Sequence, residues 1–194
     1  LKIILVLFVM MLGACAQNPQ PLGKPMPTLT YTHLTPYKVQ GGSVRVMQSA
    51  VVDAASDRAM QGLIMRPDVL ITRYAKNRFT TLETGVGLPQ KAIFNIEQLS
   101  FTKKTDEQNI VGILSGAAVD YYTLNVFVSL TPLAANGHLM RPYTIKLKRE
   151  LLIPDRSSLA EREMAQFEFL EKTIDDIDSK ITIPIIGIIP DIDA

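Results

Sequence analysis

The sequence predicts an α+β fold: a four-stranded, mainly antiparallel sheet in the order β-α-β-β-β-α, with two helices packed on one face. Three patterns in the 194 residues favour it. Apolar and polar residues alternate over 91–103 and, most cleanly, over 120–130, which is typical of half-buried strands. Apolar residues also recur three or four apart over 164–181, which is typical of a helix that covers a sheet.

The first part of the domain holds one strand and one helix. Residues 43–52 contain several valines and form a strand candidate after a glycine pair. Residues 53–65 fit either a loop or an irregular helix. Pro67 suits the first turn of a helix, and apolar residues at helical spacing extend that helix over 67–82.

Three strands follow, and they predict an antiparallel meander. In the first, over 91–103, the apolar phase changes after Ile96, which indicates a β-bulge. The second, over 120–130, places five apolar residues on one face: Tyr122, Leu124, Val126, Val128 and Leu130. The third covers 143–153, and three of its polar residues face away from the core: Lys146, Lys148 and Glu150. An Asn-Gly pair at 136–137 is a typical hairpin turn between the last two strands.

The last helix is the best-defined element in the sequence. Ser158 and Glu161 form a capping box at its start, and its apolar stripe continues to Ile181. The tail 181–194 is rich in isoleucine. We expect a regular helix or a central strand to be prevented there by Pro184, Gly187 and Pro190.

The first fifteen residues have the pattern of a cleaved leader. Lys2 precedes ten apolar residues, 3–12. Ten helical residues span about 15 Å, which is too short for a bilayer core of about 30 Å. The run is therefore typical of a signal peptide, which we place over 1–14.

Four residues at the end of this leader form a recognisable motif: Leu12, Gly13, Ala14 and Cys15. They resemble a bacterial lipobox. The resemblance implies that cleavage leaves Cys15 first, carrying a covalent diacylglycerol and an N-acyl chain, and that Leu1 corresponds to an alternative start codon. No other cofactor is expected. The alternative is a chance cysteine in an ordinary secretory signal or in a short membrane anchor.

A lipid anchor implies that the protein is located at a membrane. Each buried methylene group contributes about 0.8 kcal/mol to membrane attachment, and two or more chains make it stable. The expected location is the cell envelope, with the chain facing the periplasm. Ala16 and Gln17 differ from the Asp that retains enterobacterial lipoproteins in the inner membrane, and this resemblance favours the outer membrane.

Residues 15–40 are predicted to tether the domain, which covers 41–194. The tether is rich in proline, and proline favours extended backbone. Two alternatives remain open for it. Either it extends freely from the lipid surface, or part of it packs along the domain through Tyr31, Leu34 and Tyr37.

Composition and motifs give no indication of catalysis or of a metal site. The near balance of 20 Lys and Arg against 19 Asp and Glu argues against nucleic-acid binding, and one cysteine excludes a Cys-cluster zinc site. His33 and His138 are expected in solvated loops, so we expect no enzyme. Charged groups on the two helices are interpreted as solvated faces: Arg66, Arg73, Lys76 and Arg78 on the first, and Asp175, Asp176 and Asp178 on the second. For the first helix, the alternative is a basic side that meets anionic headgroups or an acidic partner.

Apolar residues outside the expected core are candidates for a contact surface. They come from the segment 110–119, from the outer face of the strand over 120–130, and from the C-terminal tail: Ile110, Ile113, Leu114, Tyr121, Phe127, Ile185, Ile186, Ile188 and Ile189. The alternative is that the segment and the tail fold back over the sheet and complete the core.

Three stretches carry further motifs: RPDVLITRYAKNRF at 66–79, AIFNIEQLSF at 92–101 and DRSSLAEREMAQFEFLEKTIDDID at 155–178. Together they resemble a family of alphaproteobacterial lipoproteins, which implies a small α/β domain behind a lipobox. The resemblance assigns no catalytic residues.

From these observations we expect a membrane-anchored envelope lipoprotein that acts as a non-catalytic binding or structural component. Its partners are expected to be the membrane, through the lipid, and an envelope protein. The alternative, by fold-level analogy with lipoproteins of ABC or MCE lipid-transport systems, is an auxiliary protein with an apolar lipid-binding groove between sheet and helices.

Overall fold

A computed structural model of the chain describes residues 29–39, 42–81, 90–106, 118–134, 136–188 and 192–193. The predicted signal peptide and lipobox lie outside the described residues, as do Ile110, Ile113, Leu114 and Ile189. Ile185, Ile186 and Ile188 lie within a described helix, but their side chains are outside the described part.

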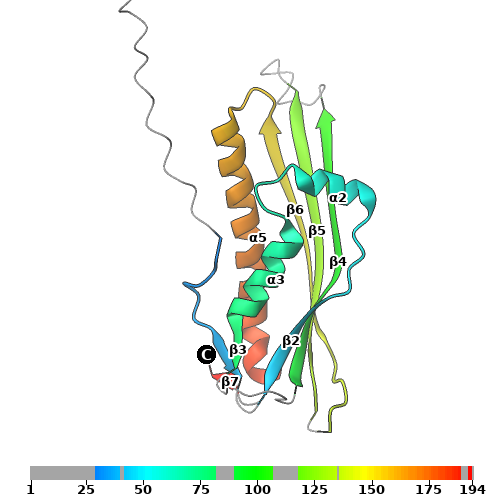
Figure 1. Cartoon of the computed structure of the whole chain (residues 1–194), viewed down its shortest axis with the longest axis vertical. Coiled ribbons are helices and arrows are strands. Elements are labelled where there is room, and N and C mark those ends of the chain that lie inside the picture. The colour runs from blue at the N-terminus through cyan, green and yellow to red at the C-terminus, as the bar shows by residue number, and fades with distance from the viewer. Residues whose placement is uncertain are drawn as a thin grey trace, which may run out of the picture.

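The main sheet has four strands in the order β2-β4-β5-β6. They are β2 (Ser43–Gln48), β4 (Gln90–Asp106), β5 (Val119–Pro132) and β6 (Tyr143–Pro154). β2 runs parallel to β4, whereas β4, β5 and β6 form the expected antiparallel meander (Figure 1). The predicted α+β class and the mainly antiparallel four-stranded sheet are confirmed.

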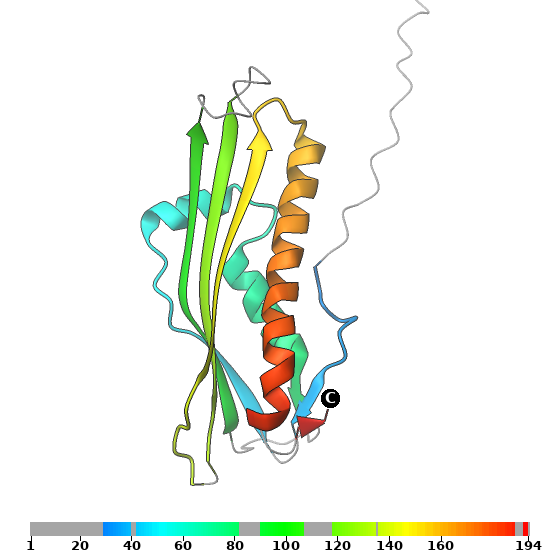
Figure 2. The same cartoon turned by 180° about the vertical axis from the view of Figure 1, so that it is seen from behind.

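The helices of the domain are α2 (Ala54–Gln61), α3 (Pro67–Arg78) and α5 (Leu159–Ile188). α3 and the long α5 lie side by side over one face of the sheet, and the opposite face has no helix layer over it among the described elements (Figures 1 and 2). α2 resolves the open choice over 53–65 in favour of a helix. It packs against β4, where the hydroxyl of Ser56 accepts a hydrogen bond from the Phe101 N–H at 3.2 Å.

A small second sheet was not expected from the sequence. β3 (Phe79–Thr81), β1 (Tyr37–Val39) and β7 (Ile192–Asp193) pair in the order β3-β1-β7. The prediction of a helix to residue 82 was wrong, because the chain leaves α3 at Arg78 and pairs with β1 from Phe79 onward.

The expectation that a regular helix is prevented in the tail was also wrong. α5 continues through Pro184 to Ile188, and β7 then pairs with β1. Proline removes a single main-chain donor from a helix. The apolar stripe of α5 remains buried up to Ile181, just before the proline, so one missing hydrogen bond does not end the helix.

The core lies between the sheet and the helices. The five side chains of β5 that were predicted to point inward are all buried, which confirms the predicted alternation: Tyr122, Leu124, Val126, Val128 and Leu130. In β4 the register shifts between Ile96 and Gln98, and Phe94 before the shift and Phe101 after it are both buried. The predicted bulge is therefore confirmed. It lets one strand keep its apolar side chains inward along its whole length.

A buried carboxylate joins the sheet to the start of α5. Asp120 is 3% exposed and accepts from Lys103 at 2.9 Å, Thr105 at 2.7 Å and Arg162 at 3.0 Å. The predicted capping box is present at the start of α5, just before Arg162. There the Ser158 N–H donates to the Glu161 carboxylate, and the Glu161 N–H donates to the Ser158 hydroxyl. These contacts fix the direction in which α5 leaves the sheet.

The segment 29–39 packs against the helices. Leu29, Tyr31 and Tyr37 are buried. Of the two alternatives for the tether, this part of it therefore packs along the domain. Tyr31 adopts a left-handed φ of 56°, which is uncommon for a residue with a large side chain. The Asn77 side chain of α3 donates to the Thr30 carbonyl at 2.6 Å and holds this turn in place.

Candidate binding site

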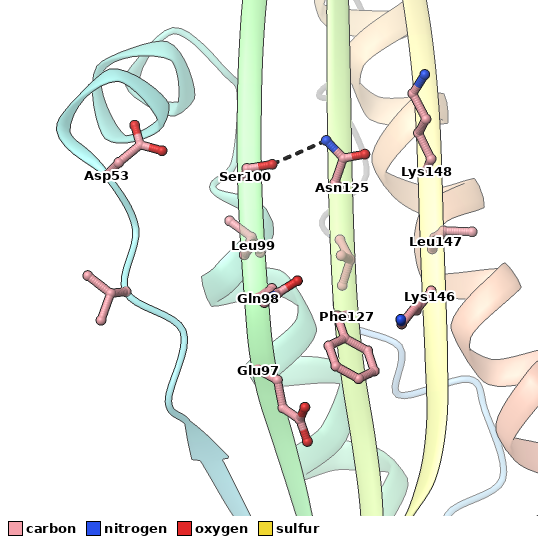
Figure 3. A pocket seen from close by; sticks show the side chains of 12 residues that line it. Asp53, Glu97, Gln98, Leu99, Ser100, Asn125, Phe127, Lys146, Leu147 and Lys148 are labelled. Carbon is pink, nitrogen blue, oxygen red and sulfur yellow. Dashed lines mark hydrogen bonds between the residues drawn. The ribbon is translucent and has the colours of Figure 1, made fainter.

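The outer face of the sheet, opposite α3 and α5, is hollowed into a pocket of about 540 Å³ (Figure 3). This volume is within the range of roughly 300–1,000 Å³ that is typical of ligand sites. The pocket is lined by twelve residues: Val51, Asp53, Glu97, Gln98, Leu99, Ser100, Asn125, Val126, Phe127, Lys146, Leu147 and Lys148.

The bulge and the end of β2 create this hollow. The N–H groups of Ser49 and Ala50 both donate to the Ile96 carbonyl, at 3.0 and 2.9 Å, and strand pairing stops there. The chain then swings away from β4 toward α2, and the side chain of Val51 is left 93% exposed. One wall of the pocket is therefore the connection from β2 to α2. The floor is β4 and β5, and the other wall is β6 (Figure 3).

The floor and the β6 wall combine an aromatic ring with polar groups. Phe127 is half-buried and lies opposite Lys146 in the β5–β6 register, with the Lys146 ammonium 5.1 Å from the ring centroid. At this distance the ring attracts the cation. Asn125 donates from its side-chain amide to the Ser100 hydroxyl at 3.2 Å, across β5 and β4 (Figure 3).

The side of the pocket away from β6 carries two carboxylates, Asp53 on the β2–α2 wall and Glu97 on β4. Asp53 caps α2 and accepts from the N–H groups of Ala55 and Ser56 at 2.9 and 2.7 Å. The main-chain N–H and the hydroxyl of Ser56 hold the pKa of Asp53 below its ordinary value. Glu97 accepts a hydrogen bond from the Ser129 hydroxyl. Both acids therefore have partners within the chain.

The chemistry of the lining is that of recognition. It offers two ammonium groups, two carboxylates, side-chain amides, a hydroxyl and an aromatic ring. Among the described residues, no cluster of three or more His, Cys, Asp or Glu side chains is arranged to hold a metal ion. His33 and His138 are both exposed in loops, away from the lining of this pocket.

Two of the predicted contact residues lie on this face. Phe127 lines the pocket, and Tyr121 is on the same face of β5, with Leu152 of β6 and Lys104 of β4 as its neighbours in the register. The side chains of the other seven residues of the predicted surface are outside the described part of the chain.

Sequence reasoning missed the wall formed by Val51 and Asp53. The phase change after Ile96 located the bulge, but nothing in the sequence indicates that β2 ends opposite it. Gln98 was missed because a polar residue at a bulge is normally interpreted as solvated.

Comparisons with known proteins give a distant structural likeness and no sequence match. No protein-family profile and no curated protein sequence matches the chain. Among solved structures, the chain is similar to a minor lipoprotein from Acinetobacter baumannii, with 12% sequence identity and a TM-score of 0.31. The likeness covers 72% of this chain and 89% of that one. At this level it carries no argument about function, so the resemblance to alphaproteobacterial lipoproteins stays a prediction.

Within the described residues, no helix combines the length and the hydropathy that crossing a bilayer requires.

Proposed function

We propose that this chain is a lipid-anchored lipoprotein of the bacterial envelope, facing the periplasm from the outer membrane, and that it binds an envelope protein without catalysing a reaction. The observation that supports the binding role is the outer face of the sheet, over which no described helix lies (Figure 2), with its pocket and the half-buried ring of Phe127. The anchor is supported by the sequence Leu12-Gly13-Ala14-Cys15 behind ten apolar residues.

Because α3 and α5 pack on one face of the sheet, the other face is the one that favours contact with a partner (Figures 1 and 2). Antiparallel sheets with one solvated face usually carry polar side chains on that face. Here Tyr121, Phe127 and Leu152 interrupt the polar pattern, and Leu152 is 46% exposed. Aromatic residues surrounded by polar side chains are enriched in protein interfaces. The outer face therefore suits a protein partner.

The alternative of an acyl-chain groove between sheet and helices stays a prediction. That space is occupied by closely packed side chains, among which Tyr74, Phe94 and Leu170 are fully buried. A lipid tail there would have to displace them, whereas the pocket on the outer face is already open.

The lipid anchor is tested by labelling and by mass. In an expressing Gram-negative host fed radiolabelled palmitate, the wild-type protein should carry label and sediment with outer membranes. Its intact mass should begin at Cys15 with the lipid attached. The matched variant Cys15→Ala should lose the label. An unmodified thiol or an uncleaved leader in the wild-type protein contradicts the anchor.

The contact surface is tested by photocrosslinking in cells. A photoreactive phenylalanine analogue at Phe127 should give a discrete adduct with one envelope protein. The same analogue at Glu168, an exposed position on α5 and thus on the helix layer, should not. Equal adducts at both positions, or none at Phe127, argue against binding through the outer face.

A further inference from the structure

Two lysines of β6 leave positive charge at one side of the pocket. Lys146 and Lys148 alternate with Leu147, so both project from the outer face, about 7 Å apart along the strand. Within the described residues, Lys146 contacts the Phe127 ring and no carboxylate. Lys148 pairs with Glu150 at 2.6 Å, but both side chains are more than half exposed. An exposed pair contributes only about 0–1 kcal/mol, so a ligand carboxylate can replace Glu150.

The two acids of the pocket, Asp53 and Glu97, form no ion pair with Lys146 or Lys148 among the described residues. Asp53 uses one carboxylate oxygen for the N–H groups of Ala55 and Ser56, and the other accepts from the Ser56 hydroxyl at 3.0 Å. Glu97 is held by Ser129. A ligand carboxylate can therefore be accepted at β6, on the side of the pocket away from these two acids.

The floor between the two walls suits a peptide main chain. The side-chain amide of Gln98 is exposed and makes no hydrogen bond within the described residues, and Asn125 keeps its amide oxygen available after donating to Ser100. A side-chain amide offers a donor and an acceptor, which are the two groups that a peptide unit presents. Next to these amides, Phe127 and the exposed Val51 supply apolar contact area.

We propose that this pocket binds an extended segment of the partner protein in which an acidic residue stands next to an apolar one. The carboxylate pairs with Lys146 and Lys148, the apolar side chain packs on Phe127, and the main chain bonds to Gln98 and Asn125. This inference rests on the proposed function, since it specifies the partner's chemistry at the same face.

The two acids explain why a peptide fits better than an anionic membrane surface. A bilayer rich in acidic headgroups presents many negative charges at once, and Asp53 and Glu97 repel those that approach the β4 side. A segment with one carboxylate can place it at β6 and its uncharged part over β4. Opposite charges on the two sides of the pocket therefore also set the direction in which the segment lies.

The test uses the processed protein purified in detergent and a displayed library of random seven-residue peptides. Selection on the wild-type protein should enrich Asp or Glu beside Leu, Ile, Val or Phe. Binding of the enriched peptides should fall about fivefold or more in Lys146→Glu, as expected for losing an exposed charge pair and adding a repulsion. Gln98→Ala should weaken the binding of these peptides less than Lys146→Glu does.

The matched control is Lys172→Glu, because Lys172 is an exposed lysine on α5, in the helix layer, and the change in net charge is the same. Its peptide binding should equal that of the wild type, and all variants should keep the wild-type melting temperature. No acidic enrichment, or equal loss in both lysine variants, overturns the inference. So does binding to vesicles of anionic phospholipid that depends on Lys146 without any peptide enrichment.

These outcomes separate the inference from the proposed function. If Phe127 crosslinks to one envelope protein in cells but the library shows no acidic preference, the contact function stands and the inference fails. If the crosslink is also absent, both fail.

Discussion

The guanidinium group of Arg78 on α3 lies 2.7 Å from the carboxylate of Asp178 on α5. The Tyr74 hydroxyl donates to the same carboxylate oxygen at 2.6 Å, and the guanidinium stacks over the Tyr37 ring, 3.9 Å from its centroid. Because Tyr37 belongs to β1, one carboxylate ties together two helices and the small second sheet.

Replacing this carboxylate should destabilise the domain. The side chains of Arg78 and Asp178 are only 9% and 17% exposed, so Asp178→Asn leaves a buried cation without its counter-charge. We expect the free energy of unfolding in urea to fall by about 3 kcal/mol. Asp175→Asn, at an exposed position of the same helix, should change it by less than about 0.5 kcal/mol. Equal effects of the two variants contradict a structural role for the pair.

The same pair shows what periodicity can and cannot predict. Helical spacing predicts two solvated faces, one that includes Arg78 and one that includes Asp178. Spacing along a helix gives the face on which a residue lies, but not what packs against that face. The two residues are 100 positions apart, and their contact depends on how α3 crosses α5.

Elements defined by local patterns were predicted well, and elements defined by distant pairing were not. The alternation in β5, the bulge in β4 and the Ser158 capping box depend on neighbouring residues, and all three are present. β3 and β7 exist only because β1 lies between them, so a helix to residue 82 and an irregular tail were the wrong local choices.

The candidate site was predictable only in part for the same reason. The outward direction of Phe127 followed from strict alternation along β5, and that of Lys146 from alternation along β6. The pocket also needs the parallel pairing of β2 with β4 and its end at Ile96. No local pattern encodes that register, which depends on contacts between segments about 50 residues apart.

Acid should weaken the link between the sheet and α5. Burial alone raises the pKa of Asp120, but its hydrogen bonds from Lys103, Thr105 and Arg162 outweigh burial and hold it below the ordinary value. The stability from Asp120 is therefore complete above the ordinary aspartate pKa of about 3.9 and is lost as the pH falls through the lower pKa of the folded state. Asp120→Asn should be less stable at pH 7 in urea unfolding, and the difference should shrink toward pH 3. A constant difference contradicts this account.

Two buried tyrosines should respond in opposite directions to loss of their hydroxyl groups. The Tyr31 hydroxyl is buried without a hydrogen-bond partner among the described residues, whereas the Tyr74 hydroxyl donates to Asp178. An unsatisfied buried polar group destabilises a fold, so Tyr31→Phe should raise the free energy of unfolding by about 1 kcal/mol. Tyr74→Phe should lower it by about 1.5 kcal/mol, because it loses a bond to a charged group. Urea unfolding measures both, and a loss of stability in Tyr31→Phe would show that the hydroxyl has a partner.

The turn between β5 and β6 depends on the backbone of Gly137. Its φ of 80° lies in the left-handed region, and a Cβ placed there meets no atom within 4 Å. Gly137→Ala therefore adds backbone strain without a steric clash, and it should lower the free energy of unfolding by about 1 kcal/mol. Gly62 is the matched control, because its φ is −83° and an added Cβ would lie at an ordinary 3.7 Å from the Ala59 carbonyl oxygen. Gly62→Ala should raise stability by about 0.5 kcal/mol, since alanine has less freedom to lose on folding. Similar losses of stability in both variants would contradict this account, because they would mean that the left-handed backbone of Gly137 is not the cause.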